Sequence, residues 1–352
     1  MKTRLGIVVA VLLIGIGVLW AKAPRTAAQA PQPSGHVLKA DPTNVHWGYF
    51  SAALKPVLTI NSGEIVTMED VPRIPPEVVE RSGVIPPNEI PDNYRAIWRD
   101  VKDRLGPHIL VGPVYVNGAE PGDVLEVRIL DIEFPTTIAV NVQRPYNGVL
   151  PEEFTQLWTR IIRLDRQNKT AEVAKGVVVP IQRPFFGTMG VAPDPLAGRI
   201  SSIPPGVHAG NMDNRDLGAG STMFLPVHAP GALFSVGDAH AAQGHGEVDL
   251  TAIETALRGR FQLILRKDMK LRWPRAETPT HWIVMGLHPD LDEALKIAVR
   301  ETIDFITGRF PHLSRQEAYM IASVAVDYHV TQAVDQTRGI HGMIPRAIFA
   351  SR

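Results

Sequence analysis

Short apolar runs separated by glycine and proline make up most of the chain before residue 266. Runs of this length between turn residues are typical of β-strands. Two of them flank Asn61-Ser62-Gly63, which is typical of a β-hairpin turn. Residues 249–266 carry β-branched and leucine side chains around Gly259, a composition that favours two strands over one helix, although residues 251–260 are also compatible with a helix. The pattern predicts strands at residues 56–60, 64–68, 111–116, 124–132, 172–175, 177–181 and 233–236, and it leaves residues 154–164 open between helix and strand.

After Pro289 the apolar period becomes that of a helix. Asp290 and Glu293 have the spacing of a capping box, and apolar residues follow at helical intervals as far as Gly308. Ser314 and Glu317 repeat this signature before a second apolar face. We therefore expect a mainly β fold of the α+β class, with two C-terminal helices packed on the outside of its sheets.

Two regions rich in proline and glycine interrupt the strands. Residues 72–91 have few periodic apolar positions, and we interpret them as a long surface excursion, either a lid or an oligomer contact. Residues 184–213 present His208, Asn211 and Asp213 on a loop. Functional side chains concentrate on loops held by a rigid scaffold. The alternative is a connecting loop whose Asn and Asp residues cap turns.

The first 30 residues have the pattern of an export signal. The basic start Met1-Lys2-Thr3-Arg4 precedes an apolar run at residues 5–20, and Ala28-Gln29-Ala30 is a cleavage site. The run is shorter than the ~20 residues of a membrane-spanning helix, which favours cleavage over an N-terminal membrane anchor. We expect a signal peptide at residues 1–30, a disordered lead-in at 31–44 and a folded domain at 45–352. Such a protein resides in the periplasm or cell envelope without stable membrane anchoring.

Composition narrows the classes of function. Lys+Arg and Asp+Glu both number 36, so the net charge is zero and nothing indicates nucleic acid as a partner. The sequence has no cysteine, which excludes disulfides and a thiolate nucleophile, and leaves nitrogen and oxygen ligands for any metal. A serine nucleophile stays open, although no G-x-S-x-G motif is present.

Residues 237–248 combine many small residues with polar side chains. Glycine and alanine let the backbone lie close to a ligand. If the preceding strand continues, Asp238 and His240 share one face, because side chains alternate along a strand. A carboxylate and an imidazole followed by Glu247 suit a divalent metal. The alternative is a glycine-rich turn whose Asp and His make ordinary hydrogen bonds.

Three further residues are candidates with structural alternatives. Glu126 lies on a predicted strand, where a solvated position is the simpler interpretation. Glu254 lies in an otherwise weakly polar strand and is a candidate inward carboxylate. His46 adjoins Trp47 and is either a ligand or a buried core histidine.

Four motifs together resemble the acetamidase/formamidase family. They are VHWGYFS at residues 45–51, GPVYV at 112–116 with PGDVL at 121–125, HAGNMD at 208–213 and GDAHAAQG at 237–244. The similarity runs in order from about Val45 to Pro345. The resemblance implies hydrolysis of short linear amides to a carboxylate and ammonia, a β-sandwich-like fold and homo-oligomers. The chain departs from the family motif at His245, where the family has Asp, which changes the charge of the pocket.

The motif and the resemblance together suggest a metal-dependent mechanism. Asp238 and His240, with one or two of His46, Asp213 and Glu247, are predicted to hold a divalent ion that activates a water. Zinc is the first choice for this ion and calcium is the alternative.

The remaining polar residues are assigned to proton transfer and substrate binding. Glu247, Glu126 or Glu254 takes the proton from the water. Asn211 or backbone N–H groups stabilise the oxyanion, while His208 and Gln243 bind the substrate. The competing hypothesis is an exported binding or scaffold protein that keeps the fold without catalysis. The completeness of the polar set favours an enzyme.

Overall fold

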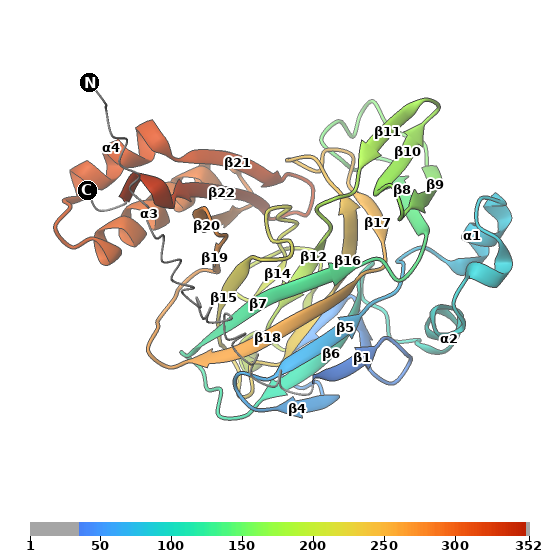
Figure 1. Cartoon of the computed structure of the whole chain (residues 1–352), viewed down its shortest axis with the longest axis horizontal. Helices are drawn as coiled ribbons and strands as arrows, with labels where there is room; N and C mark the ends of the chain where they lie inside the picture. The colour runs from blue at the N-terminus through green and yellow to red at the C-terminus, as the bar shows by residue number, and fades with distance from the viewer. Residues whose placement is uncertain (1–34, 350–352) are drawn as a thin grey trace, which may run out of the picture. The chain divides into compact units, whose positions relative to one another are not determined.

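The computed structural model describes residues 35–349 (Figure 1). The predicted signal peptide lies outside these residues. Within them, His36–Lys39 form strand β1, which pairs in parallel with β5 (Ile65–Glu69). The prediction of a disordered lead-in is therefore wrong for this segment, because its backbone extends the edge of a sheet. In the described part of the chain, no helix has both the length and the apolarity to cross a membrane.

Two large β-sheets form the body of the protein. In order across the nine-stranded sheet, the strands are β1, β5, β18 (Arg258–Arg266), β7 (Val124–Glu133), β15 (Thr222–Pro226), β19 (Arg275–Glu277), β20 (His281–His288), β22 (Arg338–Pro345) and β21 (Asp327–Gln332). The main path of the eleven-stranded sheet is β11 (Val177–Pro180), β10 (Thr170–Ala174), β9 (Trp158–Asp165), β8 (Ile138–Gln143), β17 (Ile253–Thr255), β16 (Phe234–Ala242), β12 (Phe185–Gly190) and β14 (Ala209–Asn211). β6 (Ile109–Val116) pairs with β16, and β2 (Val45–Trp47) and β4 (Leu58–Ile60) pair with β6. A small separate sheet joins β3 (Tyr49–Ser51) to β13 (Arg199–Ser201).

The two large sheets pack face to face over one apolar core. Phe261 of β18 lies with its ring centroid 5.5 Å from that of Phe186 in β12 and 5.9 Å from that of Phe234 in β16. Alternate residues of β7, among them Val127, are buried in the same core. The predicted mainly β, sandwich-like fold is confirmed.

Most predicted strands are present, but the predicted hairpin is not. β4 joins β6 in the eleven-stranded sheet, whereas β5 lies between β1 and β18 in the other sheet. The turn at Asn61-Ser62-Gly63 therefore carries the chain from one sheet to the other. A turn sequence favours reversal of the chain and does not determine which strand each arm pairs with. The ambiguous segment 154–164 contains strand β9.

The two capped C-terminal helices are confirmed as α3 (Leu291–Arg309) and α4 (Arg315–Ala325). The Asp290 side chain accepts hydrogen bonds from two backbone N–H groups of the first turn of α3, and Ser314 with Glu317 forms the full capping box of α4. α3 packs on β20 and β22, at one end of the molecule in Figure 1. Gly286 of β20 permits this contact, since a Cβ there would lie 2.1 Å from the Ala294 carbonyl oxygen.

The predicted surface excursion at residues 72–91 is wrong. It contains α1 (Pro76–Ser82) and the 3₁₀ helix η1 (Pro87–Glu89), and α2 (Asp92–Asp100) follows it. Val79 and Ile85 are fully buried in the main core. Proline at the first position of a helix is compatible with helix formation, so a proline-rich segment still forms short helices here. The other 3₁₀ helices are η2 (Pro195–Ala197) and η3 (Arg346–Phe349).

Candidate metal-binding active site

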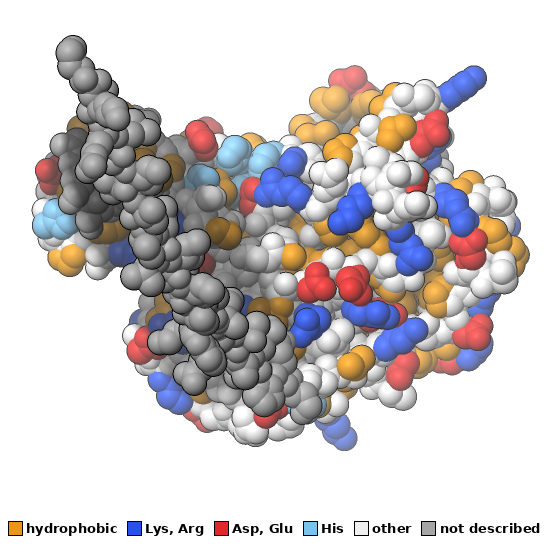
Figure 2. All heavy atoms as spheres, in the orientation of Figure 1, with side chains coloured by type: hydrophobic (Ala, Val, Ile, Leu, Met, Phe, Trp, Pro, Cys, Tyr) orange, Lys and Arg blue, Asp and Glu red, His pale blue; other side chains and the backbone are white. Residues whose placement is uncertain are grey.

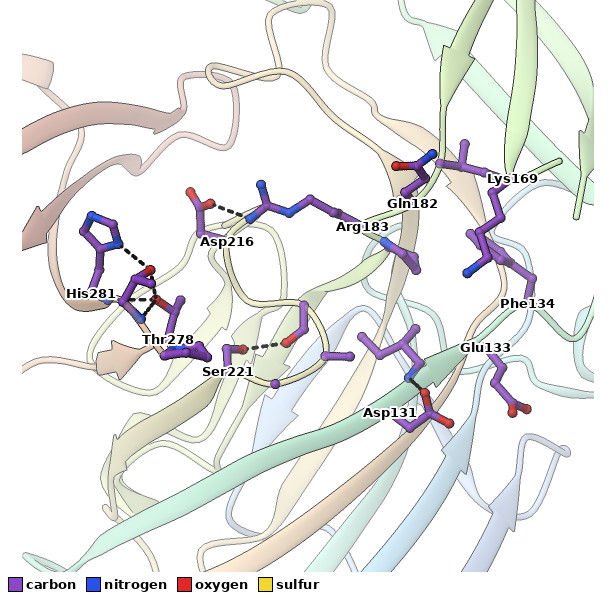
Figure 3. A pocket seen from close by; sticks show the side chains of 18 of the residues that line it. Asp131, Glu133, Phe134, Lys169, Gln182, Arg183, Asp216, Ser221, Thr278 and His281 are labelled. Atoms are coloured by element: carbon purple, nitrogen blue, oxygen red, sulfur yellow. Dashed lines mark hydrogen bonds and ion pairs between the residues drawn. The ribbon is translucent and has the colours of Figure 1, made fainter. Parts of the chain in front are cut away.

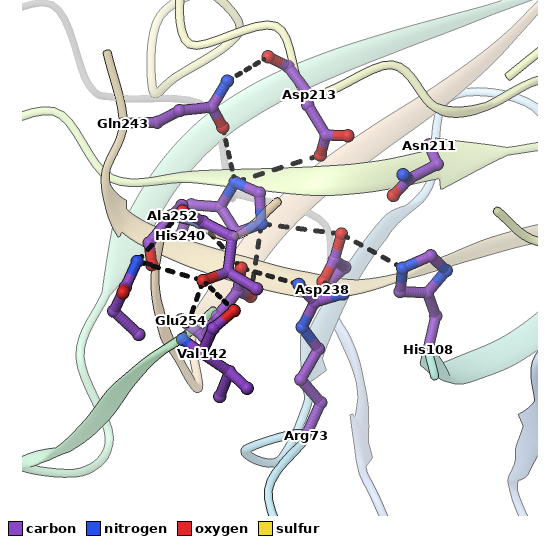
Figure 4. Close-up of polar contacts among 12 residues, drawn as sticks. Arg73, His108, Val142, Asn211, Asp213, Asp238, His240, Gln243, Ala252 and Glu254 are labelled. Carbon is purple, nitrogen blue, oxygen red and sulfur yellow. Dashed lines mark hydrogen bonds and ion pairs between the residues drawn. The ribbon is translucent and has the colours of Figure 1, made fainter. Parts of the chain in front are cut away.

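β16 carries Asp238 and His240 into the interior of the eleven-stranded sheet (Figure 4). Both side chains are almost fully buried, and His240 Nε2 lies 3.5 Å from Asp238 Oδ2. β17 pairs with β16 so that Glu254 is directly opposite His240, and Glu254 Oε2 lies 3.3 Å from His240 Nε2. The strand pairing therefore directs two carboxylates and one imidazole toward a single point.

Arg73 orients the two carboxylates. Its guanidinium lies 2.9 Å from Asp238 Oδ1 and 2.8 Å from Glu254 Oε1. These contacts occupy the outer oxygens and leave Asp238 Oδ2 and Glu254 Oε2 facing His240 Nε2 (Figure 4). Within residues 35–349, neither His240 Nε2 nor Glu254 Oε2 makes a hydrogen bond. Buried polar atoms in this state are uncommon and indicate a missing partner.

Gln243 fixes the orientation of the His240 ring. Gln243 Nε2 donates hydrogen bonds to the backbone carbonyls of Asp213 and Thr331, at 2.8 and 3.4 Å. Its Oε1 is therefore the acceptor for His240 Nδ1, 2.8 Å away. A hydrogen bond at one ring nitrogen directs the other nitrogen toward a metal. Here that other nitrogen is Nε2, which faces the carboxylates.

The spacings of Asp238 Oδ2 and Glu254 Oε2 from His240 Nε2 fit an ion with tetrahedral coordination. Two ligand atoms 2.0–2.2 Å from such an ion lie roughly 3.3–3.6 Å apart. The observed separations are 3.3 Å from His240 Nε2 to Glu254 Oε2 and 3.5 Å to Asp238 Oδ2. His108 approaches the same oxygen of Asp238, with Nε2 3.7 Å away, while its Nδ1 contacts the Ser202 hydroxyl at 2.8 Å. The donor set therefore fits a divalent metal.

Three more carboxylates surround this point: Asp213, Glu247 and Asp335 are all buried. Burial and the charge of Asp238 raise the pKa of Asp213 to about 6. Burial and the charge of Asp213 raise the pKa of both Glu247 and Asp335 well above the ordinary range. Asp213 and Glu247 also bring ligand atoms close to His240. So much buried negative charge favours either protonation or a bound cation.

Burial and neighbouring charges act in opposite directions on the pKa values of Asp238 and His240. Burial acts to raise the pKa of Asp238, but Arg73, His108 and His240 hold it well below its usual range. Burial acts to lower the pKa of His240, but Glu254 and Asp238 raise it well above its usual range. Without a metal, these charges favour a proton on His240 Nε2, between the carboxylates. A metal ion would take the place of that proton.

A cavity of about 350 Å³ gives access to the cluster. Its lining includes Arg73, His108, Glu254 and Asp335. A second cavity, of about 480 Å³, reaches Gln243 and Glu247 from another side. A larger cavity, of about 1040 Å³, is lined by other residues, including Asp131, Arg183 and His281 (Figure 3). We therefore identify the candidate site by its convergent buried polar groups and not by the size of its cavity.

The sequence pattern of the acetamidase/formamidase family matches residues 98–201 and 196–351. The chain belongs to this family. The match confirms the resemblance seen in the sequence and the predicted class of enzyme, a hydrolase of carbon–nitrogen bonds in linear amides. The matched residues include Asp238, His240 and Glu254 but not Arg73.

Two relatives and one solved structure illustrate the similarity. The acetamidase of Mycolicibacterium smegmatis is 29% identical over 290 residues, covering 64% of this chain and 68% of that protein. The formamidase of Methylophilus methylotrophus is 27% identical over 330 residues, covering 71% of this chain and 79% of that protein. The crystal structure of the acetamidase from Yersinia enterocolitica superposes with a TM-score of 0.76 at 27% identity, covering 92% of this chain and 95% of that chain.

Most of the predicted site residues of this family member meet in one cluster. The structure brings together Asp238, His240, Asp213, Glu247, Glu254 and Gln243. Asn211 is a near neighbour, because its Oδ1 accepts a hydrogen bond of 2.6 Å from Thr188 Oγ1, which lies 3.4 Å from Asp238 Oδ2. Gln243 contacts His240 and backbone carbonyls, so the structure gives it a positioning role rather than the predicted substrate contact.

Three predicted site residues lie outside this cluster. Both ring nitrogens of His46 already have partners, the Tyr49 carbonyl at 2.7 Å and the Ser235 hydroxyl at 2.9 Å, so His46 does not fit the predicted role of ligand. His208 packs edge-on against Phe50, with ring centroids 5.2 Å apart. Glu126 is in the other large sheet and pairs with Arg128 and Arg266, which accounts for its buried carboxylate.

Sequence reasoning missed Arg73, His108 and Asp335. Arg73 belongs to the segment interpreted as a surface excursion, where a single arginine between apolar and proline residues has no periodic signal. His108 lies directly before β6, and a prediction that started the strand at residue 108 instead of residue 111 would have included it. Asp335 follows β21 in a turn. All three reach the site through pairing between distant parts of the chain, which local periodicity does not report.

Proposed function

We propose that this protein hydrolyses short linear amides with a divalent ion held by Asp238, His240 and Glu254. The carrying observation is the convergence of His240 Nε2, Asp238 Oδ2 and Glu254 Oε2 on one buried point, with spacings of 3.3 and 3.5 Å. The names of the relatives, acetamidase and formamidase, support a small primary amide as substrate. The access cavity of about 350 Å³ is consistent with such a small molecule.

The ligand chemistry favours zinc over calcium. Imidazole nitrogen and carboxylate oxygen are both zinc ligands, and three protein ligands with a fourth position open are typical of catalytic zinc. Calcium usually takes six to eight oxygen ligands, and the imidazole at the centre of this cluster does not suit it. When bound at such a site, a divalent ion polarises the amide carbonyl and lowers the pKa of a water molecule.

The protein's own groups prepare the site for this chemistry. Gln243 holds the His240 ring so that Nε2 faces Asp238 and Glu254. Arg73 holds the far oxygens of both carboxylates and offsets part of their charge. Arg73 and Gln243 are therefore positioning residues, and both contribute to metal affinity through the orientation of the ligands.

Glu247 is the proposed proton-transfer group. Its Oε2 is buried and, among the described residues, makes no hydrogen bond. Burial and the charge of Asp213 raise its pKa well above the ordinary value, which suits a carboxyl group that takes a proton from water and gives it to the departing nitrogen. Glu254 is less suited, because its Oε1 already accepts hydrogen bonds from Arg73 and from the Ala252 N–H. Ammonia then leaves with the proton that Glu247 Oε2 carried.

Asn211 is the proposed donor to the oxyanion. Its Oδ1 accepts from Thr188 Oγ1 at 2.6 Å, so its Nδ2 is the end left to donate. Donors aimed at a developing oxyanion stabilise the transition state more than the substrate.

Ammonia release from formamide, acetamide and propionamide tests the proposal. Purified protein is assayed as isolated, after removal of metal by a chelator, and after addition of Zn²⁺ or Ca²⁺. Hydrolysis that disappears on chelation and returns with Zn²⁺ supports the proposal. Binding of an amide without ammonia release would support the competing hypothesis, a protein that keeps the fold without catalysis.

We also propose export to the periplasm or cell envelope and assembly into homo-oligomers. The export proposal rests on the basic start, the short apolar run and Ala28-Gln29-Ala30. Intact mass and sedimentation of the protein purified from its native compartment test both. A mass that includes residues 1–30 in a membrane fraction would instead show an anchor.

A further inference from the structure

A second group of metal-binding side chains lies outside the proposed active site. Asp216 comes from the loop between β14 and β15, His245 from the segment after β16, and His341 from β22. His341 Nε2 lies 3.3 Å from Asp216 Oδ2, and His245 Nε2 lies 3.8 Å from the same oxygen. One ligand atom from each residue falls within 4.8 Å of the other two.

Neighbouring residues hold each of these side chains in place. The Thr331 hydroxyl contacts His341 Nδ1 at 2.7 Å, which leaves Nε2 facing Asp216. Arg183 donates to Asp216 Oδ1 at 3.2 Å, which leaves Oδ2 facing the histidines. His329 stacks on His245 with ring centroids 4.4 Å apart and an interplanar angle of 17°. Partners that fix the far atoms of ligands, as Thr331 does for His341 and Arg183 for Asp216, are characteristic of built metal sites.

The group is accessible from one side. The side chain of His341 is fully buried, whereas those of Asp216 and His245 are 12% and 30% exposed. His329 is the cross-strand partner of His341 in the β21–β22 pair, so both rings lie on one face of that sheet. Figure 2 shows histidine side chains gathered at the surface near the ends of β21 and β22. An ion can therefore enter from solvent and keep an open coordination position.

We propose that Asp216, His245 and His341 form a second binding site for a divalent transition metal, with zinc as its natural occupant. Two imidazole nitrogens and one carboxylate oxygen select zinc, copper or nickel over magnesium and calcium, which prefer oxygen ligands. None of these three ligands belongs to the proposed active site.

The position of the second site suggests what its ion does. Gly246, next to His245, is joined to the C-terminal strands by hydrogen bonds from its N–H to the Thr331 carbonyl and from the Ala333 N–H to its own carbonyl. An ion at the second site would tie β22 to the segments that carry Asp213 and Glu247 of the active site. We expect it to stabilise that junction rather than to take part in amide hydrolysis.

Metal stoichiometry tests this inference. Metal-stripped full-length protein is equilibrated with Zn²⁺ and its bound zinc is measured by mass spectrometry. Wild type is expected to bind two ions per chain, and His245→Asn one. Loss of an outer hydrogen-bonding partner typically lowers metal affinity by roughly 10–100-fold. Loss of a direct ligand is expected to lower the affinity for the second ion by more than that. His312→Asn, a change of an exposed histidine on another loop, is the matched control and keeps both ions.

A reciprocal variant separates this site from the active site. His240→Ala is expected to lose one ion and all amide hydrolysis, while His245→Asn keeps hydrolysis and loses the part of the Zn²⁺-dependent thermal stabilisation that the second ion contributes. Asp216→Asn provides a second disruption should His245→Asn fail to fold. His245→Asn and Asp216→Asn that both bind as many zinc ions as wild type would overturn the inference. That result would leave the proposed amide hydrolysis untouched.

Discussion

Gly187 of β12 lies against the proposed metal site, and adding one methyl group there should inactivate the protein. A Cβ at this position would lie 2.3 Å from Asp213 Oδ1, 2.8 Å from His240 Cε1 and 2.9 Å from Asp238 Oδ2. Ordinary contacts between carbon and oxygen are about 3.3 Å or longer. Gly187→Ala therefore forces a displacement of about 1 Å, whereas metal–ligand distances tolerate roughly 0.2 Å.

The expected loss of activity is large and the loss of stability is moderate. Misplacement of a reacting group by 1 Å can cost on the order of 10²-fold in rate. Overpacking a buried position typically costs about 1–3 kcal/mol of unfolding free energy. Activity is measured as kcat/KM for ammonia release, stability by urea denaturation, and bound metal by mass spectrometry.

Gly244→Ala is the matched control for this substitution. A Cβ at Gly244 has no atom within 4 Å, although the residue belongs to the same polar motif. We expect it to change stability by less than about 0.5 kcal/mol and to keep the metal. Gly187→Ala with wild-type activity and metal content would refute our account of the site, because the added methyl group would then fit without displacing the proposed ligands.

Three further predictions concern the groups around the metal. Arg73→Met should lower the free energy of unfolding by about 3–5 kcal/mol in urea denaturation, because it leaves two buried carboxylates unpaired; Arg73→Lys should restore part of the loss, and equal stability of all three proteins would contradict the pairing. Gln243→Leu should lower zinc affinity and kcat by roughly 10–100-fold with little change in KM, since the His240 ring loses its orienting partner; an unchanged zinc titration would remove Gln243 from this role. The metal-free protein should gain about 2 kcal/mol of stability as pH falls from about 6 to 4, because the pKa of Asp213 is raised in the folded state to about 6 from about 3.9 in the unfolded chain; denaturation curves at both pH values check the sign, and zinc affinity should fall over the same range as protons compete.

The site could be predicted from the sequence where its geometry is local. Asp238 and His240 are two residues apart on one strand, so the period of a strand is enough to place them on one face. Glu254 was a candidate because a carboxylate stood in a weakly polar strand, and the observed pairing puts it directly opposite His240. The capped C-terminal helices were also predictable, because a capping box is defined by residues three apart.

The rest of the site depends on contacts between distant segments. Arg73 and Glu254 are separated by 181 residues, and no pattern near Arg73 indicates a buried ion pair. The predicted pairing of β4 with β5 is wrong for the same reason, since a turn sequence carries no information on long-range pairing. Glu126 has the opposite problem: its position on a strand was clear, but its partners Arg128 and Arg266 could be identified only from the sheet that they share.

The central claim is that Asp238, His240 and Glu254 bind a divalent ion directly. The most direct test is a crystal structure of the protein equilibrated with Zn²⁺, with diffraction recorded on both sides of the zinc absorption edge. Our account predicts an anomalous peak about 2.0–2.2 Å from His240 Nε2, Asp238 Oδ2 and Glu254 Oε2. It is contradicted if well-defined density at that point shows only hydrogen-bonded water, with His240 Nε2 donating to a carboxylate and no anomalous signal in the cluster.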